Sequence, residues 1–400
     1  MRPPADTPDV ARWRADTPGC ERRIHLNNAG ASLVPHAVRQ AVDAHLDLED
    51  ELGGYEAMDA QSGALRQAAD DVGRLLGASR RNIAFTQNST AAFAQALGAF
   101  DFAPGDAIVT SRADYASNQI MYLSLARRRG VRVVRAPDLP EGGVDPDAVR
   151  GLIREQRPKL VAITWVPTNS GLVQDVAAVG EACRSAAVTY LVDACQAVGQ
   201  IPIDMETIGC DYLAATSRKF LRGPRGCGFL CASDRVLAAG AHPLLVDMHG
   251  ADWVDPDRFE LTPDARRFEL WEISSALVLG VGAAARYALG VGIETARDRT
   301  RALAAYARAR LAELPGVRVL DRGAELCAIV TVEPAGRPGA ELKLALRARG
   351  INTSSPERED AVIDMDEKRA ASALRFSPHY YNTAGEIDAA VGALGEVLGA

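Results

Sequence analysis

Short apolar runs alternate with amphipathic segments through the middle of the chain. The apolar runs predict strands at residues 83–86, 107–110, 131–134, 160–165, 188–192, 212–215 and 227–231. Most are separated by segments with helical periodicity, at 90–99, 117–129, 145–156 and 175–185. This alternation of near-continuous apolar strands with helices is typical of an α/β domain on a mostly parallel sheet, here of seven strands.

The pattern changes after about residue 256. A long Ala- and Leu-rich helical region covers 274–314, and helices follow at 339–349 and 385–398. Strands are predicted near 316–320, 327–332 and 372–377. We therefore expect an N-terminal arm at 1–25, a large α/β domain at 26–270, and a smaller α+β domain with a linking helix at 271–400.

The composition and charge of the chain argue against several classes of function. The 400 residues are 48% hydrophobic and carry a net charge of −7, with no basic stripe interleaved with aromatics, so nucleic acid is not an expected partner. No apolar run reaches the roughly 18 residues of a membrane span, and the N-terminus has no hydrophobic signal core. We expect a cytoplasmic protein. Seven cysteines without metal-ligand spacing fit a reducing compartment and no metal site.

Lysine is scarce in this chain, which makes Lys219 conspicuous. Only four of the 45 basic residues are lysines, and Lys219 stands in Thr-Ser-Arg-Lys-Phe-Leu-Arg-Gly-Pro-Arg-Gly between two predicted strands. Arg218, Arg222 and Arg225 should favour its neutral, nucleophilic form. The chemical interpretation is a Schiff-base lysine that holds pyridoxal phosphate, and the alternative is a surface lysine in a basic loop.

Polar residues follow two of the predicted strands. Ser89 and Thr90 lie between the strand at 83–86 and the next helix, where free backbone N–H groups make an anion site or an ordinary helix cap. Asp193 ends the strand at 188–192, and Gln196 follows. A carboxylate there is suited to pair with a protonated pyridine nitrogen, although it too can be a helix cap. Ligands collect at the carboxyl ends of parallel strands.

Three further residues complete this prediction. Tyr115 follows the strand at 107–110 and is suited to lie over a flat ring, and Thr168 follows the strand at 160–165 and is suited to bond the ring's phenolic oxygen. Arg375, on a predicted strand of the smaller domain, is suited to clamp a substrate carboxylate, or is a surface charge. Together the order and strand-end placement of these residues predict a pyridoxal phosphate site.

These motifs give the chain a family resemblance from residue 26 to residue 383. It is similar to the class V aminotransferases of fold type I, which include cysteine desulfurases, selenocysteine lyases, isopenicillin N epimerase and kynureninase. The resemblance implies that Asp193 and Gln196 contact the cofactor ring, and that Ser89, Thr90, Thr216 and Arg218 contact its phosphate.

The same resemblance implies that Lys219 forms the Schiff base and Arg375 binds the substrate. It places Asn28 and Tyr55 at the substrate pocket. It also implies a homodimer with shared active sites, in which the segment 267–269 approaches the partner's cofactor.

The chain departs from the desulfurases within this resemblance. Desulfurases carry a nucleophilic cysteine on a small-domain loop, but residues 352–361 contain none. Thr168 replaces their usual Asn, and Tyr115 their stacking His. We therefore expect β-elimination from a cysteine S-conjugate. Transamination, decarboxylation-coupled oxidative deamination and epimerisation share the same core and remain alternatives, and a regulator that only retains the cofactor is disfavoured.

Overall fold

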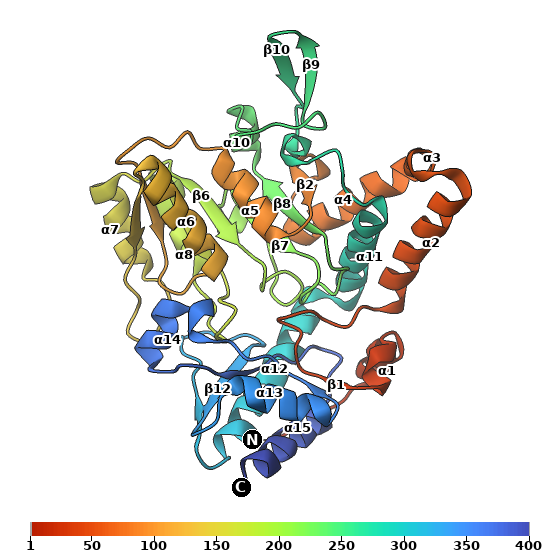
Figure 1. Ribbon diagram of the computed structural model, residues 1–400, viewed down its shortest axis with the longest axis vertical. Helices are drawn as coiled ribbons and strands as arrows, with labels where there is room; N and C mark the ends of the chain where they lie inside the picture. The colour runs from red at the N-terminus through yellow and green to blue at the C-terminus, as the bar shows by residue number, and fades with distance from the viewer. Residues whose placement is uncertain (1, 400) are drawn as a thin grey trace.

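A seven-stranded sheet forms the centre of the large domain in the computed structural model, which describes residues 2–399 (Figure 1). Its strand order is β2-β8-β7-β6-β5-β3-β4. β8 runs antiparallel to both of its neighbours and the other pairs are parallel. The strands are β2 (Ile83–Thr86), β3 (Ala107–Thr110), β4 (Arg132–Arg135), β5 (Leu160–Thr164), β6 (Thr189–Asp193), β7 (Tyr212–Thr216) and β8 (Gly228–Ala232). The predicted fold, mostly parallel and seven-stranded, is confirmed.

Alternate side chains of each strand enter the cores on opposite faces of the sheet. On β5, Leu160 and Ala162 join the core with α5 and α6, and Val161 and Ile163 join the core with α4, α7, α8 and α11. Both faces are apolar because helices cover both, which is why the strands read as continuous apolar runs. These helices are α4 (Ser62–Leu76), α5 (Ser89–Gly98), α6 (Ala116–Arg129), α7 (Pro146–Gln156), α8 (Val176–Ser185) and α11 (Ser275–Val291).

The smaller domain packs its helices on a three-stranded sheet of order β11-β12-β14 (Figure 1). Its core holds Leu303, Val332, Leu346, Phe376 and Leu394. Its elements are α12 (Ile293–Ala312), β11 (Val317–Val319), β12 (Val330–Pro334), α13 (Gly339–Ala348), β13 (Ile351–Asn352), α14 (Val362–Lys368), β14 (Leu374–Phe376) and α15 (Ala384–Leu398). α11 packs on α2 (His36–Leu52) and α4, so this linking helix is anchored to the large domain.

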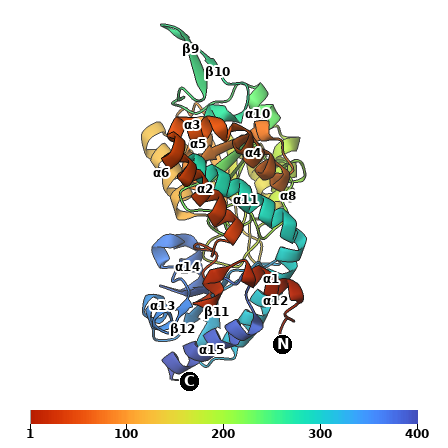
Figure 2. The same ribbon diagram turned by 90° about the vertical axis from the view of Figure 1, so that its right-hand side faces the viewer.

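The N-terminal arm is more ordered than its sequence indicates. It forms α1 (Pro8–Ala15), which buries Val10 and Trp13, and β1 (Ile24–His25), which pairs with β13 of the smaller domain. Periodicity does not predict this helix because only two of its side chains are buried against the rest of the protein. In Figure 2 α1 lies beside the smaller domain.

A β-hairpin projects from the large domain where no strands were predicted (Figures 1 and 2). It consists of β9 (Ala251–Asp255) and β10 (Arg258–Leu261), and its side chains are almost all exposed, including Trp253 and Phe259. The remaining short helices are α3 (Gly54–Ala60), α9 (Met205–Ile208) and α10 (Asp234–Ala238).

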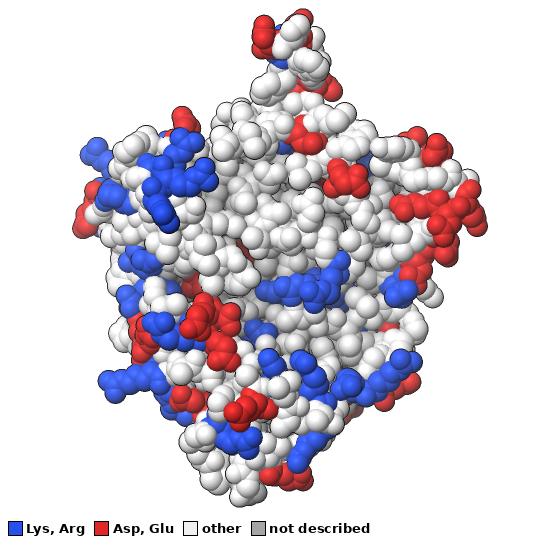
Figure 3. Space-filling model, in the orientation of Figure 1, with Lys and Arg blue, Asp and Glu red and all other residues white. Residues whose placement is uncertain are grey.

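Charges of both signs are spread over the face drawn in Figure 3. Acidic side chains gather over α2 and α3, and the basic residues Arg127, Arg128 and Arg129 lie at the end of α6. Among the described residues no single helix is long and apolar enough to cross a membrane. α11 and α12 meet that criterion only when they are taken together as one segment, and the chain bends by 78° between them.

Candidate active site

The sheet register brings the predicted residues together at one edge. Thr86 and Thr216 both face Gly228, and Asp193 faces Thr164, so the segments after β2, β5, β6 and β7 emerge side by side. A Cβ on Gly228 would lie 2.8 Å from the backbone carbonyl carbon of Asn88, closer than side chains tolerate. Glycine at this position therefore lets the turn that opens α5 approach the loop that holds Lys219.

Lys219 is buried, with 7% of its surface exposed. Its Nζ lies 5.9 Å from the centroid of the Tyr115 ring, so these two residues are neighbours. Burial lowers the pKa of Lys219, and the charges of Arg218 and Arg375 lower it further, against the opposing effects of Cys195 and Asp193. The amine is therefore biased towards its neutral, nucleophilic form.

The cations that act on Lys219 differ from those expected. Arg218 contributes, but Arg222 turns away into the N-terminal arm and Arg225 is exposed. The second cation is Arg375, which is distant in sequence. Local spacing failed here because a tight loop sends neighbouring side chains in different directions, as the positive φ of 62° at Arg222 illustrates.

Asp193 is buried at the end of β6 and held on both oxygens. Oδ1 accepts a hydrogen bond from the backbone N–H of Cys195 (2.9 Å) and Oδ2 accepts one from Nδ2 of Asn118 (2.9 Å). Sequence reasoning missed Asn118 and its neighbour Asp114. The available signal was their position soon after β3, because Asp114 precedes the N-cap residue Tyr115 and Asn118 lies in the first turn of α6.

Arg375 reaches from β14 of the smaller domain into the site. Its Nη1 donates to the carbonyl (2.7 Å) and hydroxyl (2.8 Å) oxygens of Thr168, and its Nη2 donates to Oδ1 of Asn27 (3.3 Å). Asn28, the predicted substrate contact, is fully buried and uses its carboxamide within the protein, where it donates to the Ser377 carbonyl (2.7 Å). Of the two neighbouring asparagines, Asn27 is the one that meets the arginine.

Gln196 connects Thr168 to the N-terminal segment. Its Nε2 donates to Oγ1 of Thr168 (3.0 Å) and to the carbonyl of Ala29 (3.0 Å). Its Oε1 and the Nε of Arg375 are buried and have no hydrogen-bond partner among the described residues. Buried polar atoms without partners are uncommon in proteins and indicate a place where a ligand supplies the missing contacts.

The predicted phosphate residues surround the start of α5. Ser89 is buried there, whereas Thr90 is exposed. Thr216 lies at the end of β7 with its hydroxyl 3.4 Å from the Cys227 carbonyl, and Arg218 donates from Nη1 to the carbonyl of Gly30. Their roles towards a phosphate stay predictions.

Two predicted segments lie apart from this cluster. Tyr55 is 64% exposed on α3. Arg267 and Glu269 are buried and bind groups of their own chain. Arg267 donates to backbone carbonyls such as that of Leu237 (3.2 Å), and Glu269 accepts from the Phe85 N–H (2.7 Å). The 267–269 segment is thus turned inwards, and the exposed element beside it is the β9–β10 hairpin.

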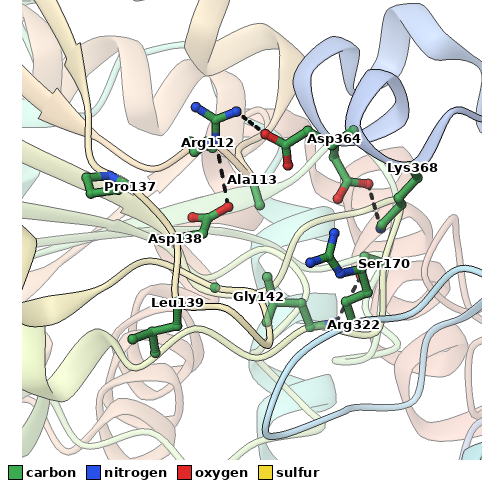
Figure 4. Close-up of a pocket in the computed structure, with 13 residues that line it drawn as sticks. Arg112, Ala113, Pro137, Asp138, Leu139, Gly142, Ser170, Arg322, Asp364 and Lys368 are labelled. Atoms are coloured by element: carbon green, nitrogen blue, oxygen red, sulfur yellow. Dashed lines mark hydrogen bonds and ion pairs between the residues drawn. The ribbon is translucent and has the colours of Figure 1, made fainter.

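A charged pocket of about 290 Å³ lies between the two domains (Figure 4). Arg112 pairs with Glu367, and Lys368 pairs with Asp364 (2.7 Å). The pocket is separate from Lys219 and its ionic groups neutralise one another. The Arg112–Glu367 pair joins the two domains.

The residues at the strand ends fit pyridoxal phosphate. Lys219 offers a buried amine with a lowered pKa, Tyr115 a flat ring beside it, and Asp193 a buried carboxylate held in one orientation. Gln196 adds a buried oxygen without a partner. No group of three or more His, Cys, Asp or Glu residues capable of holding a metal ion occurs within residues 2–399.

Comparisons with known proteins agree with this geometry. Residues 24–390 match the family described as aminotransferase class-V. A probable hercynylcysteine sulfoxide lyase from Mycobacterium tuberculosis is 30% identical over 98% of this chain and 94% of its own. A probable cysteine desulfurase from Methanothermobacter thermautotrophicus is 28% identical over 98% of both chains.

Solved structures show the same fold. The cysteine desulfurase CsdA from Escherichia coli is 26% identical and superposes with a TM-score of 0.89, over 98% of this chain and 99% of its own. A cysteine desulfurase from Thermococcus onnurineus, 24% identical, also superposes with a TM-score of 0.89, over 100% of this chain and 99% of its own. The expected resemblance is confirmed, and the chain belongs to the class-V aminotransferase family of pyridoxal-phosphate-dependent enzymes.

Proposed function

We propose that this enzyme is a C–S lyase that catalyses β-elimination from an S-substituted L-cysteine. The observation that carries the proposal is a lysine and arginine site on a chain whose 352–361 loop contains no cysteine. The relatives named as a sulfoxide lyase and as desulfurases both point to a substrate of the cysteine type. Elimination cleaves the C–S bond without a protein thiol, whereas capture of sulfur from free cysteine requires one.

The cysteines of the chain favour elimination. Of the seven, only Cys195 is partly exposed, and it lies beside Asp193. Burial, together with the charge of Asp193, raises the pKa of Cys195 to about 11. Burial likewise raises the pKa of Cys183 and of Cys231 to about 12. Because the thiolate is the nucleophile, these thiols are poor acceptors of sulfur at neutral pH.

The side chains divide the work as follows. Arg375 binds the substrate carboxylate, exchanging its contacts with Thr168 and Asn27 for a two-pronged interaction. Lys219 accepts the α-proton at Nζ, which its lowered pKa permits. Pyridoxal phosphate, when bound, supplies the electron sink for the pair of electrons left at the α-carbon. Asp193 provides the negative charge that keeps the pyridine nitrogen protonated.

In the elimination, the Cα–H bond and the Cβ–S bond break and a Cα–Cβ double bond forms. The sulfur leaves with its electron pair as a thiolate, or as a sulfenate when the substrate is a sulfoxide. The three-carbon fragment takes up water and gives pyruvate and ammonia. No oxidant or reductant enters this balance.

An apolar cavity of about 450 Å³ supports a substituted substrate over free cysteine. Ile120 and Leu123 of α6 line one side and Val362 and Ile363 of α14 the other. Asn169, the residue after Thr168, and Asp114, the residue before Tyr115, also line the cavity. A substituent on sulfur that occupied this cavity would bury apolar surface, worth about 0.8 kcal/mol for each CH₂ group.

Product analysis with a panel of substrates tests the function. We expect S-alkyl and S-aryl cysteines and their sulfoxides to give pyruvate and ammonia in equal amounts. Alanine or a protein persulfide formed from free cysteine would instead place the enzyme with the desulfurases. A new amino acid formed from an added keto acid would mean transamination, and a D-amino acid would mean epimerisation. Release of CO₂ would mean decarboxylation.

The proposal includes a homodimer. The β9–β10 hairpin and the segment before it expose Trp253 and Leu245, each 81% exposed, together with Leu244 and Met248. A monomer rarely leaves such a group of apolar side chains in water. We expect sedimentation to give twice the mass of one chain, and Trp253→Glu to shift the protein towards the monomer. A monomeric wild type at micromolar concentration would contradict this part of the proposal.

A further inference from the structure

A second buried carboxylate, Asp114, lies behind the site. It is 6% exposed at the start of α6. Its oxygens accept hydrogen bonds from Thr110 Oγ1 (3.0 Å), Thr164 Oγ1 (2.5 Å) and Gln119 Nε2 (2.8 Å), as well as from the backbone N–H of Tyr115 (2.7 Å). Within the described chain these donors are neutral and Asp114 forms no ion pair. A buried carboxylate without a cation is costly, so its retention calls for an explanation.

Asn118 joins this carboxylate to Asp193. A single amide nitrogen, Nδ2, lies 2.9 Å from Oδ2 of Asp193 and 3.2 Å from Oδ1 of Asp114. An amide nitrogen carries two hydrogens, so it can donate to both carboxylates at once. Thr164 closes the group, because its hydroxyl donates to Asp114 and lies 3.3 Å from the same nitrogen.

Asp114 is thereby linked to both residues predicted to flank the cofactor ring, directly to Tyr115 and through Asn118 to Asp193. Through Asn118 it fixes the carboxylate of Asp193, and through the N–H of Tyr115 it fixes the residue whose ring lies beside Lys219. We propose that Asp114 and Asn118 are positioning residues that orient Asp193 towards the pyridine nitrogen and strengthen the hold of that nitrogen on its proton.

The electrostatic surroundings of Asp114 agree with this positioning role. Burial raises the pKa of Asp114 and the nearby charge of Asp193 adds to this rise, against the lowering effect of the hydrogen bonds from Thr164, Gln119 and Asn118. The hydrogen bonds to Asp114 are all donated to its carboxylate and favour its ionised form, which would add a negative charge that helps keep a bound pyridine nitrogen protonated. The other titratable groups that act on this pair are Tyr122 of α6, Cys195 and Lys219.

The competing explanation is that Asp114 only stabilises the start of α6. Asp211 provides a matched control because it is also a buried carboxylate, 6% exposed, and accepts a hydrogen bond from the Tyr190 N–H (2.9 Å). It pairs with Arg235 and, within residues 2–399, forms no hydrogen bond to the residues of the site. Asp211→Asn therefore removes a buried charge while leaving Asp193 and its partners in place.

The experiment compares Asp114→Asn with Asp211→Asn in the cofactor-loaded enzyme. The first readout is the visible absorption of the bound cofactor against pH. We expect Asp114→Asn to move its titration by on the order of one pH unit, which corresponds to 1.36 kcal/mol, and Asp211→Asn to leave it unchanged. The second is kinetics, in which Asp114→Asn lowers kcat about 10-fold with little change in KM.

The third readout is cofactor binding, and Asn118→Ala supplies a second variant if Asp114→Asn does not fold. Removing the bridge frees Asp193 to rotate, so Asn118→Ala should show the same spectral shift and weaker retention of the cofactor during dialysis. The inference is overturned if both variants keep the wild-type titration. It is also overturned if Asp114→Asn loses only thermal stability, as Asp211→Asn does.

Discussion

Lys219 and Arg222 are two buried cations in one loop, and their surroundings are opposite. Arg222 is 1% exposed and every guanidinium nitrogen has a partner: Nε donates to the Leu33 carbonyl (3.0 Å), Nη1 to the hydroxyl of Tyr380 (2.8 Å) and Nη2 to Thr17. Its carbon Cζ also lies 4.5 Å from the centroid of the Tyr381 ring. Lys219, by contrast, has one aromatic ring at 5.9 Å.

The difference follows from the acid–base chemistry of the two side chains. Arginine cannot shed its proton, so burial is tolerable only when all of its donors and its charge are satisfied. Lysine can lose its proton, and burial shifts its pKa downwards. Arg222, whose donors all have partners, holds the N-terminal arm against the smaller domain. Lys219, which has one aromatic ring beside it, is available for chemistry. Burial alone therefore does not identify a reactive basic residue. A buried basic residue is identified as reactive when the groups around it leave its donors without hydrogen-bond partners.

Replacing Lys219 gives the strongest test of its contrast with Arg222. Lys219→Ala should abolish turnover, by on the order of 10³-fold or more, because both the covalent anchor and the proton acceptor are lost. Its thermal stability should remain close to that of the wild type in the absence of cofactor. Borohydride reduction of the wild type, followed by peptide mapping, should label Lys219. A label on Lys159, Lys343 or Lys368 would mean that Lys219 is not the lysine that binds the cofactor, and its contrast with Arg222 would not hold.

Replacing Arg222, the structural cation, should instead lower the stability of the fold. Arg222→Met leaves the hydroxyls and carbonyls around it without a donor and should cost about 3–5 kcal/mol in the free energy of unfolding. Urea denaturation measures this loss. The control is Arg225→Met, an exposed arginine of the same loop, which should change the unfolding free energy by less than about 0.5 kcal/mol. Equal effects of the two variants would contradict the role of Arg222.

Arg375 is an intermediate case, because two of its nitrogens have partners and Nε has none. Burial lowers its pKa to about 10, so the guanidinium stays charged at neutral pH. Arg375→Lys keeps a charge but loses the two-pronged fit to a carboxylate, and KM should rise by roughly 10-fold. The absorption of the bound cofactor should stay unchanged. Unaltered steady-state kinetics would mean that another residue binds the carboxylate.

The smallest expected effect concerns pH and stability. Because the pKa of Lys219 is lowered in the folded state, the unfolded chain binds more protons below the ordinary lysine value of 10.5. Lys219 therefore destabilises the cofactor-free protein at neutral pH, and this cost fades as pH rises towards that value. Lys219→Met should be more stable than the wild type at pH 7, with a difference that shrinks by pH 10. Arg222→Met should show no such convergence.

Local pattern was sufficient for the sheet and for part of the site. Each strand of the central sheet lies within about one residue of its apolar run, since burial on both faces leaves a continuous signal. The scarcity of lysine singled out Lys219, and the strand-end rule placed Asp193, Tyr115 and Thr168 at the same edge. The hairpin at 251–261 was missed because its side chains are exposed and carry no alternation of buried and exposed positions.

The sequence by itself determined the fold class and the family, and it predicted Lys219 as the reactive lysine, because these depend on periodicity and on single residues at strand ends. Only the tertiary structure decided which cations act on Lys219, that Asn27 meets Arg375, and that Asp114 reaches Asp193 through Asn118. Those contacts join separate elements, and whether a buried charge is reactive or structural depends on how many partners these elements bring to it.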